Sequence, residues 1–554
     1  MAPRYQVPWL RPGNLVARAL EMRLPDGPIF VAPLPSQVSG VDFLGLAAVN
    51  ERLAALALPG ITNITRYMRA YSAMCWLVWR FAQHMSQIAA RKPISEREIA
   101  KQFRQFREKV ELLFTLGNPD YTQIAGQTRR GLLPENGKRF PLEFSAFGDY
   151  KISWFDAAVY GPSLGVESGL GFIARAPGNS YRPTDLGEEL AKALDELLRK
   201  SKFYDALTDI ESITGSTDMI DDLAKRWTVR QSTAKERTCF RKALTPENAG
   251  AEGTNLAANR VAMIHLILAA VELLGGSASV DEVRQTVARG VSPRRKPLRM
   301  DGTEKTQAMW AVLQLRQLQR LSHESLLRWL ELTLMSPPTD LKGRTPAALA
   351  ELAASQAAQY FNLDPMDDLE VVLNQFEAPK DTPDFYLAGL SSKRLDPFEW
   401  LGIIQSLRNV ETDTARLPGA ALAGLVISAK QASFLTLSER HAPFLSIGRA
   451  GRLSLQSLVG IFASYQNATV SEFIRFLVES CVIGQHFKTT NAKLEPNKNK
   501  YRFIRTDEGL RLLIRESQVT RLNVTGDRLD NAMELMVDCG LLDWHGDDDS
   551  YHLP

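Results

Sequence analysis

Cysteine is scarce in this chain, with four residues in 554. Cys75, Cys239, Cys481 and Cys539 lie far apart, and none belongs to the C-x-x-C pairs that are typical of zinc sites. Their wide spacing also argues against the disulfide framework of small secreted domains. The sequence therefore predicts no metal, no cofactor and a reducing, cytoplasmic location.

An excess of charge of one sign is missing too, because 66 basic residues are balanced by 63 acidic ones. The resulting net charge of +3 gives no global field that points to a polyanionic partner, so a nucleic-acid site has to be local. Long apolar runs are also lacking. The N-terminus has no signal-peptide core, and the most apolar later run, 262–274, is short and contains His265 and Glu272. We expect neither secretion nor a membrane partner.

Recognisable catalytic motifs are lacking as well. No Walker A sequence occurs. Residues 161–165 match the G-x-S-x-G nucleophile elbow, but the Gly-rich residues that follow Ser163 do not predict the helix that an elbow requires. The acidic tail 543–552 contains two histidines, yet crowded acids at a chain end are more typical of a solvated turn than of a metal site. A non-enzymatic role is favoured, and a nuclease or hydrolase with dispersed residues stays an alternative.

The composition is that of an ordinary globular protein, with 45% hydrophobic and 23% charged residues. Hydrophobic periodicity predicts a mainly α, multidomain fold of helical bundles with winged-helix-like modules and short β-hairpins. We expect five units: an N-terminal helical domain with an extended beginning (1–155), a hairpin with helices (156–245), a helix-turn-helix-like domain (246–345), a helical connector (346–450) and a C-terminal winged-helix-like domain (451–554).

The stretch 59–84 predicts a helix that begins at Thr62 or Asn63, either of which can cap it. One side of this helix is apolar, and the other carries Arg66, Arg69 and Arg80. These arginines are interpreted either as the solvated side of a core helix or as an anion-binding face, since guanidinium groups suit phosphate oxygens.

Two further segments predict local structure clearly. Residues 171–184 read as a β-hairpin around Pro177-Gly178-Asn179 that leads into a helix capped by Thr184, which resembles a degenerate wing. Residues 255–288 predict two helices joined by a short glycine turn, the helix-turn-helix pattern. The most basic loop of the chain follows and contains Arg294, Arg295, Lys296 and Arg299. Clustered cations of this kind suit phosphate contacts, although a solubilising loop would look the same.

The C-terminal segment predicts a second winged helix. Helices are expected at 453–464 and 471–483, followed by a polar loop and by an alternating strand at 501–505. The loop and strand contain Lys498, Lys500 and Arg502, which we interpret as a basic wing. A further helix that ends at Gly540 and a strand at 541–544 complete the tail.

Two stretches carry a resemblance to a known class of proteins. Ile61-Thr-Asn-Ile-Thr-Arg-Tyr-Met-Arg69, with Trp76 and Trp79 downstream, and Tyr181-Arg-Pro-Thr-Asp-Leu-Gly-Glu-Glu-Leu-Ala191 resemble segments of uncharacterised helical proteins from bacterial antiviral defence and restriction islands. The resemblance covers less than a fifth of the chain. It implies an antiviral role beside other protein subunits and transfers no site residue.

These observations predict a non-enzymatic nucleic-acid-binding or scaffolding component of a bacterial multiprotein system. The expected partners are other subunits of that system and nucleic acid, with DNA favoured and bound independently of sequence through phosphate contacts. A pure protein-docking subunit is the first alternative, and an exposed apolar patch without a continuous basic surface would favour it.

Overall fold

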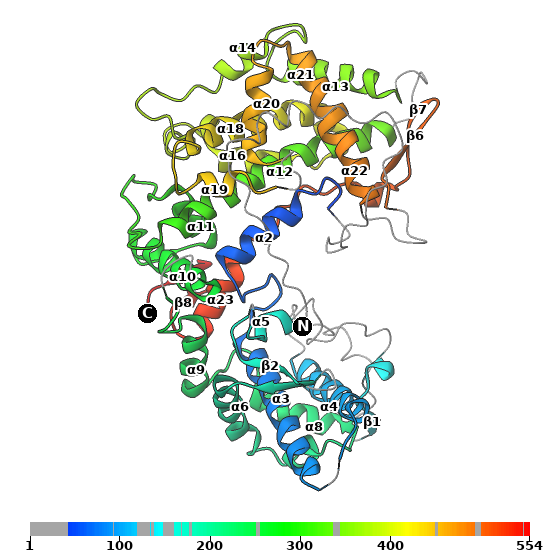
Figure 1. The fold of residues 1–554 in the computed structure, drawn as a ribbon, viewed down its shortest axis with the longest axis vertical. Helices are drawn as coiled ribbons and strands as arrows, with labels where there is room; N and C mark the ends of the chain where they lie inside the picture. Colours follow the sequence, from blue (N-terminus) through cyan, green and yellow to red (C-terminus); the bar gives the residue numbers. More distant parts are fainter. Residues whose placement is uncertain are drawn as a thin grey trace, which may run out of the picture.

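The computed structural model describes most of the chain, and its helices form an elongated body (Figure 1). The described residues are 42–91, 93–118, 133, 138–147, 160–167, 169–176, 180–250, 255–335, 344–448, 453–492, 500–546 and 548–554. Their structure is mainly helical with a few short antiparallel strand pairs, which confirms the mainly α fold class. The body divides into an N-terminal lobe, a central layer and an upper lobe.

The N-terminal lobe is built around α3, a long helix that is buried on nearly all sides. Trp76 on α3 donates a hydrogen bond of 2.8 Å from its indole Nε1 to Asp195 Oδ1 of α6, which joins the two helices inside the core. The lobe contains α3 (Met68–Ala89), α4 (Glu96–Leu116), β1 (Arg139–Pro141), α5 (Gly161–Leu164), β2 (Ile173–Ala176), β3 (Ser180–Pro183), α6 (Asp185–Leu198), α7 (Tyr204–Thr208), β4 (Thr214–Ser216), α8 (Thr217–Trp227) and α9 (Ala234–Leu244).

The central layer joins the two ends of the chain. Its strands form one antiparallel sheet in the order β5-β9-β8, in which Ala278 pairs with Tyr551 and Trp544 pairs with Tyr551 on the other side. The sheet therefore combines a strand from the middle of the chain with two from its end. The layer contains α2 (Ala47–Ala57), α10 (Leu256–Leu273), β5 (Ser277–Ala278), α11 (Val280–Arg289), α23 (Leu529–Asp538), β8 (Asp543–His545) and β9 (Ser550–His552).

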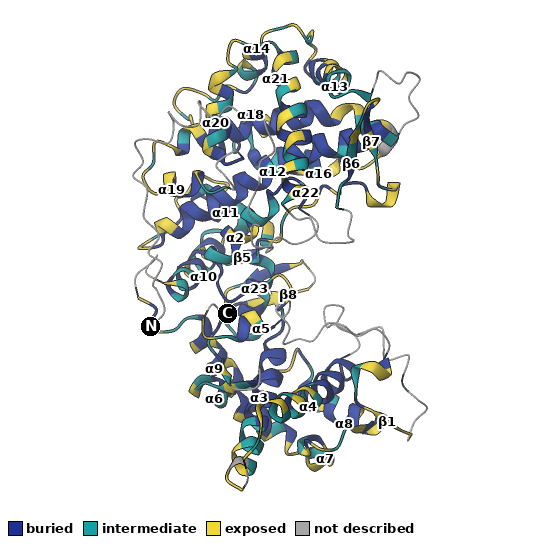
Figure 2. Ribbon diagram, turned by 45° about the vertical axis from the view of Figure 1, so that its right-hand side comes forward, coloured by how far each residue is buried: buried dark blue, intermediate teal, exposed yellow. Residues whose placement is uncertain are grey.

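The upper lobe surrounds α12 (Glu304–Met335), whose 32 residues span about 48 Å at 1.5 Å per residue. Figure 2 shows it dark blue through the middle of the lobe, because neighbouring helices cover almost every side. The other elements are α13 (Pro346–Tyr360), α14 (Leu369–Asn374), α15 (Phe385–Ala388), α16 (Pro397–Ser406), α17 (Val410–Asp413), α18 (Leu417–Leu435), α19 (Ala442–Leu445), α20 (Leu455–Ser464), α21 (Val470–Phe476), a π-helical stretch (Leu477–Gly484), α22 (Gln485–Asn491), β6 (Phe503–Thr506) and β7 (Gly509–Leu512).

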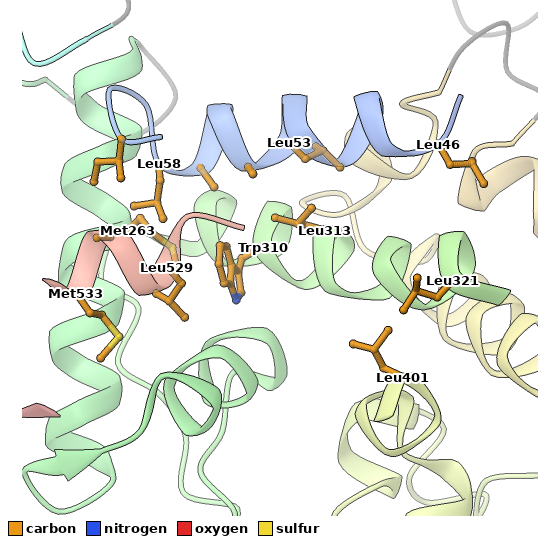
Figure 3. Packing of buried hydrophobic residues seen from close by; sticks show 14 of the residues in the cluster. Leu46, Leu53, Leu58, Met263, Trp310, Leu313, Leu321, Leu401, Leu529 and Met533 are labelled. Carbon is orange, nitrogen blue, oxygen red and sulfur yellow. The ribbon is translucent and has the colours of Figure 1, made fainter. Parts of the chain in front are cut away.

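A continuous apolar core connects the central layer with the upper lobe (Figure 3). Leu53 of α2 lies toward Leu313 of α12, and Trp310 lies beside Leu529 of α23. All four side chains are fully buried, so the N-terminal and C-terminal segments share one core with α12. Burial of side chains of this size stabilises the fold by about 1.5–3 kcal/mol each.

Residues 520–527, which we call the strap, run in an extended conformation along the polar side of α12. Gln317 holds Thr525 through both backbone groups: its Nε2 donates to the Thr525 carbonyl at 2.6 Å, and its Oε1 accepts from Thr525 N at 3.0 Å. Gln314 donates to Asp527 Oδ2 at 3.0 Å, and Arg328 donates to the Thr520 carbonyl at 2.9 Å. These bonds satisfy some of the buried polar side chains of α12, and others, such as Arg316 and Gln319, bond to the carbonyl of Leu453 in the upper lobe.

Several expected element boundaries are confirmed. Asn255 and Thr184 cap α10 and α6 by accepting hydrogen bonds from the amides of Ala258 and Gly187. The hairpin of β2 and β3 also forms where the sequence predicts it. The expected helix start at Thr62 or Asn63 is wrong, because residues 61–67 are non-helical and α3 begins at Met68.

The expected loop after residue 483 is also wrong, because the helix continues through the π-helical stretch and α22 to Asn491. The hairpin that follows, β6 with β7, is two-stranded. Helices that were expected in different domains also pack against each other. α3 packs against α6 across the boundary at residue 155, whereas α2 packs against α10 and α12.

Candidate nucleic-acid interface

The basic loop after α11 is a tight hairpin. Gly290 ends the helix in the left-handed conformation, at a φ of +68°, and Val291 then pairs with Pro297. Inside the turn, Ser292 N donates to the Lys296 carbonyl at 2.9 Å, and Arg295 N donates to the Ser292 carbonyl at 2.8 Å. The cations therefore stand on a closed, hydrogen-bonded turn.

Two contacts fix the base of this hairpin to the upper lobe. The Arg289 guanidinium forms an ion pair of 2.7 Å with Asp396, and its carbon lies 5.1 Å from the centre of the Phe398 ring. With 6% of its side chain exposed, Arg289 has a structural role. The turn itself is anchored by Arg295, whose guanidinium donates to the Ser391 hydroxyl.

Four cations of the hairpin are exposed: Arg294, Arg295, Lys296 and Arg299. Arg299 pairs with Asp301 at 3.1 Å, but both side chains are more than 80% exposed. A pair this open contributes little energy, so it does not prevent Arg299 from contacting a phosphate.

A second loop adds cations beside the hairpin. Ser391, the partner of Arg295, lies close in the chain to Lys393 and Arg394, which are both exposed. Lys393 lies 3.7 Å from Glu399, and Arg394 donates to Gln375 at 2.6 Å. We define the basic surface as these two loops together, with the residues Arg294, Arg295, Lys296, Arg299, Lys393 and Arg394. Nothing in the sequence pointed to the last two, since they are about a hundred residues away.

The three arginines expected on one face of α3 do not share a face in the structure. Arg66 precedes the helix and pairs with Asp530. Arg69 is fully buried, forms an ion pair of 3.1 Å with Glu236 and donates to the carbonyls of Arg226 and Gln231. Other helices of the N-terminal lobe cover the side on which a solvated face was expected.

Arg80 is partly buried between two aromatic rings. Its guanidinium carbon lies 5.7 Å from the Trp79 ring centre and 5.9 Å from that of Tyr204, and it donates to Gln83. These contacts hold Arg80 on the N-terminal lobe, away from the basic surface.

The three cations of the expected basic wing do not form one exposed surface among the described residues. Arg502 is 7% exposed and forms an ion pair of 2.7 Å with the fully buried Glu331 of α12, so it does not face solvent. Lys500 is half-buried, and Lys498 lies outside the described residues. The assignment of Arg502 to a phosphate-binding wing is therefore wrong, because the side chain stabilises the interior.

Two cavities share lining residues of α11 and α23: one of about 420 Å³ is also lined by Trp544 and Tyr551 of β8 and β9, and one of about 370 Å³ is also lined by the strap. They share Arg66, Asp281, Arg284 and Asp530, whose opposite charges are paired with one another or with Asp527. The first cavity also exposes the Trp544 ring, which is 46% accessible. In the structure, each of these charges therefore has a partner of opposite sign.

No catalytic geometry emerges around the serine of the G-x-S-x-G sequence. Ser163 is fully buried in the helical turn α5 and donates to the Gly60 carbonyl, with the Tyr71 hydroxyl 2.5 Å away. Desolvation raises the pKa of Tyr71 to about 12, so this phenol stays protonated and cannot serve as a base. Across the described ranges, no group of three His, Cys, Asp or Glu residues is placed to hold a metal ion.

Two buried carboxyl groups have pKa values near neutrality, and neither belongs to the basic surface. Desolvation raises the pKa of Glu324, on α12, to about 7, although Arg320 opposes the shift. Desolvation also raises the pKa of Asp538, on α23, to about 7, and the amide of Met68 and Arg230 oppose it. Both groups affect stability through the interior of the molecule.

Comparisons with known proteins found no matching protein family, no matching curated protein and no matching solved structure. One described helix, α10, is long and apolar enough to cross a membrane, with a mean hydropathy of 1.6, and half of it is buried against its neighbours. A buried core helix satisfies the same criteria.

Proposed function

We propose that this protein is a non-enzymatic scaffolding component of a bacterial multiprotein system that binds nucleic acid, with DNA favoured, through the basic surface. The observation that supports the proposal is the set of exposed cations held on two neighbouring rigid loops. Preorganised cations gain phosphate contacts without the entropy cost of ordering a loop. Antiviral defence is the setting that the resemblance of residues 61–69 and 181–191 implies.

The chemistry of the basic surface favours binding without base recognition. Its residues are arginine and lysine on turns, which contact phosphates and displace counterions. No helix of the surface projects beyond these turns to enter a groove, since α11 packs against α10, α12 and α23. We expect affinity to depend steeply on salt and weakly on sequence.

We further infer that the central layer is a winged-helix module that is split by a long insertion between its second and third helices. The order helix α10, strand β5, helix α11, then helix α23 and strands β8 and β9 supports this assignment, as does the sheet order β5-β9-β8, in which the first strand pairs with the last. The third helix, which reads DNA in many such modules, carries three carboxylates here. This favours a scaffolding use of the module.

The test is the binding of labelled duplex DNA, single-stranded DNA and RNA to the full chain across a salt series. Replacing Arg294, Lys296 and Arg299 by alanine is expected to weaken binding and to make the slope of log affinity against log salt shallower by about three. The matched control is Lys192→Ala, Lys235→Ala and Lys242→Ala, which removes three exposed cations from the N-terminal lobe. Equal effects of the two variants, or no effect of the first, would contradict the proposal.

A further inference from the structure

Helix α23 carries three carboxylates at one-turn spacing, and all three contact the N-terminal lobe. Asp530 pairs with Arg66, Glu534 pairs with Arg230 at 2.8 Å, and Asp538 accepts a hydrogen bond of 2.8 Å from the backbone amide of Met68. The opposite side of the helix is apolar and buried in the central core. We call these three residues the acidic stripe.

The acidic stripe covers a cluster of arginines on the N-terminal lobe. The guanidinium carbon of Arg230 lies 5.2 Å from the ring centre of Tyr67, which is the neighbour of Arg66 in the chain. Arg241 continues the cluster past the end of α23, where it donates to the carbonyl of Cys539 at 2.8 Å. Arg66, Arg230 and Arg241 thus follow the length of α23 on its acidic side.

These contacts are open to solvent and to competition. The side chains of Arg66 and Asp530 are 25% and 40% exposed, and that of Arg230 is 36% exposed. The cavity of about 420 Å³ is lined by Arg66, Asp530 and Glu534, so it gives a solute access to the Arg66–Asp530 pair and to the carboxylate of Glu534, which is 15% exposed. Ion pairs with this exposure contribute little individually, which allows a polyanion to replace the carboxylates.

Asp530 and Glu534 present two negative charges one turn apart to Arg66 and Arg230, as neighbouring phosphates would. We propose that Arg66, Arg230 and Arg241 form a second nucleic-acid-binding surface, which binds phosphates and which the acidic stripe occupies in the closed conformation described here. The two ligands exclude each other, because both need the same guanidinium groups. This surface is separate from the basic surface, so its existence does not depend on the function proposed above.

Helix α23 and Arg528, the residue before it, also explain the arrangement of residues 61–67. Asn531 of α23 donates to the Thr62 carbonyl at 2.6 Å, and Arg528 donates to the Ile61 carbonyl. The segment that carries Arg66 is thereby held in a non-helical conformation by α23. Displacement of α23 would therefore release this segment together with Arg66.

The experiment uses the full chain with Arg294, Lys296 and Arg299 replaced by alanine, which removes three of the six cations of the basic surface and so lowers its contribution to binding. Asp530→Asn with Glu534→Gln is expected to bind labelled duplex DNA about tenfold more tightly than this parent, because two guanidinium groups lose their competitors and gain charge-assisted bonds to phosphate. Adding Arg66→Gln and Arg230→Gln is expected to remove the gain.

The matched control is Glu188→Gln with Glu196→Gln, which removes two carboxylates from the ion pairs of α6 with Lys192 and Lys235. A gain of equal size in this control would show a general charge effect and would overturn the proposal, as would no gain or a gain that survives the arginine replacements. Hydrogen exchange of the unmodified protein supplies a test that does not depend on the variants folding. Saturating DNA at low salt should speed exchange in α23 and at 61–68, whose amide and carbonyl contacts with α23 would open, and unchanged exchange in both segments would refute the masking.

Discussion

The buried ion pair between Glu331 and Arg502 offers the sharpest test of how the upper lobe is held together. Glu331 is fully buried, and its carboxylate accepts from Arg502 at 2.7 Å and from the amide and hydroxyl of Thr520 at 2.7 and 3.0 Å. Glu331→Ala leaves the Arg502 charge in the interior without its partner. We expect a loss of about 3–5 kcal/mol in the free energy of unfolding, the cost of breaking a buried pair.

The assay is denaturant unfolding, combined with hydrogen exchange of the strap, which Glu331 holds at Thr520. A double variant, Glu331→Leu with Arg502→Met, should recover most of the loss, since apolar residues of similar volume often replace a buried pair at little cost. Glu188→Ala is the control, because its ion pair with Lys192 is exposed and worth about 1 kcal/mol or less. The reasoning is refuted if Glu331→Ala costs no more than this control, or if the double variant is no more stable than Glu331→Ala.

Three further outcomes follow from the interior of the molecule. The pKa of Asp538 is raised to about 7, so the folded state keeps a proton that the unfolded state loses above its ordinary pKa of about 4. The free energy of unfolding should therefore fall between pH 4 and 7 by up to about 1.4 kcal/mol per pH unit. Asp538→Asn should remove that part of the slope in denaturant titrations. Gly419 of α18 lies against Tyr360, and a Cβ added there would stand 2.2 Å from the Cβ of the tyrosine. Gly419→Ala should therefore lower the free energy of unfolding by about 1–3 kcal/mol in denaturant titrations. Gly460→Ala is the control, because a Cβ there would meet open space. All four cysteines are buried, and burial raises the pKa of the Cys75 thiol well above its usual range. Mass spectrometry should therefore find alkylated cysteine only after unfolding. Rapid alkylation of the native protein would contradict the described core.

Local signals in the sequence predicted the elements that depend on local chemistry. Asn255 and Thr184 cap their helices because the side-chain oxygen and the amide it binds are three residues apart. Exposed turn cations could also be predicted, since hairpin residues with no apolar partner stay at the surface.

Contacts between distant segments decided what the sequence could not show. α3 begins at Met68 because Asp538, 470 residues away, binds its first amide in place of a local cap. Arg502 looked like a surface cation in an alternating strand, and only its partner Glu331, 171 residues earlier, places it inside. Lys393 and Arg394 join the basic surface through a contact of Arg295 with Ser391. Pairings at such separations leave no periodic pattern in the chain.

The sheet of the central layer has a consequence for synthesis on the ribosome. β5 emerges with residues 277–278, but its partner β9 comes only with residues 550–552, about 270 residues later. Until then, the apolar faces of α10 and α11 lack the cover that α23 and the last strands provide. Throughout that interval the nascent chain therefore carries an unfinished core, a state prone to aggregation. Losing residues 529–552 would uncover the middle of the molecule, so this late segment protects the chain from aggregation.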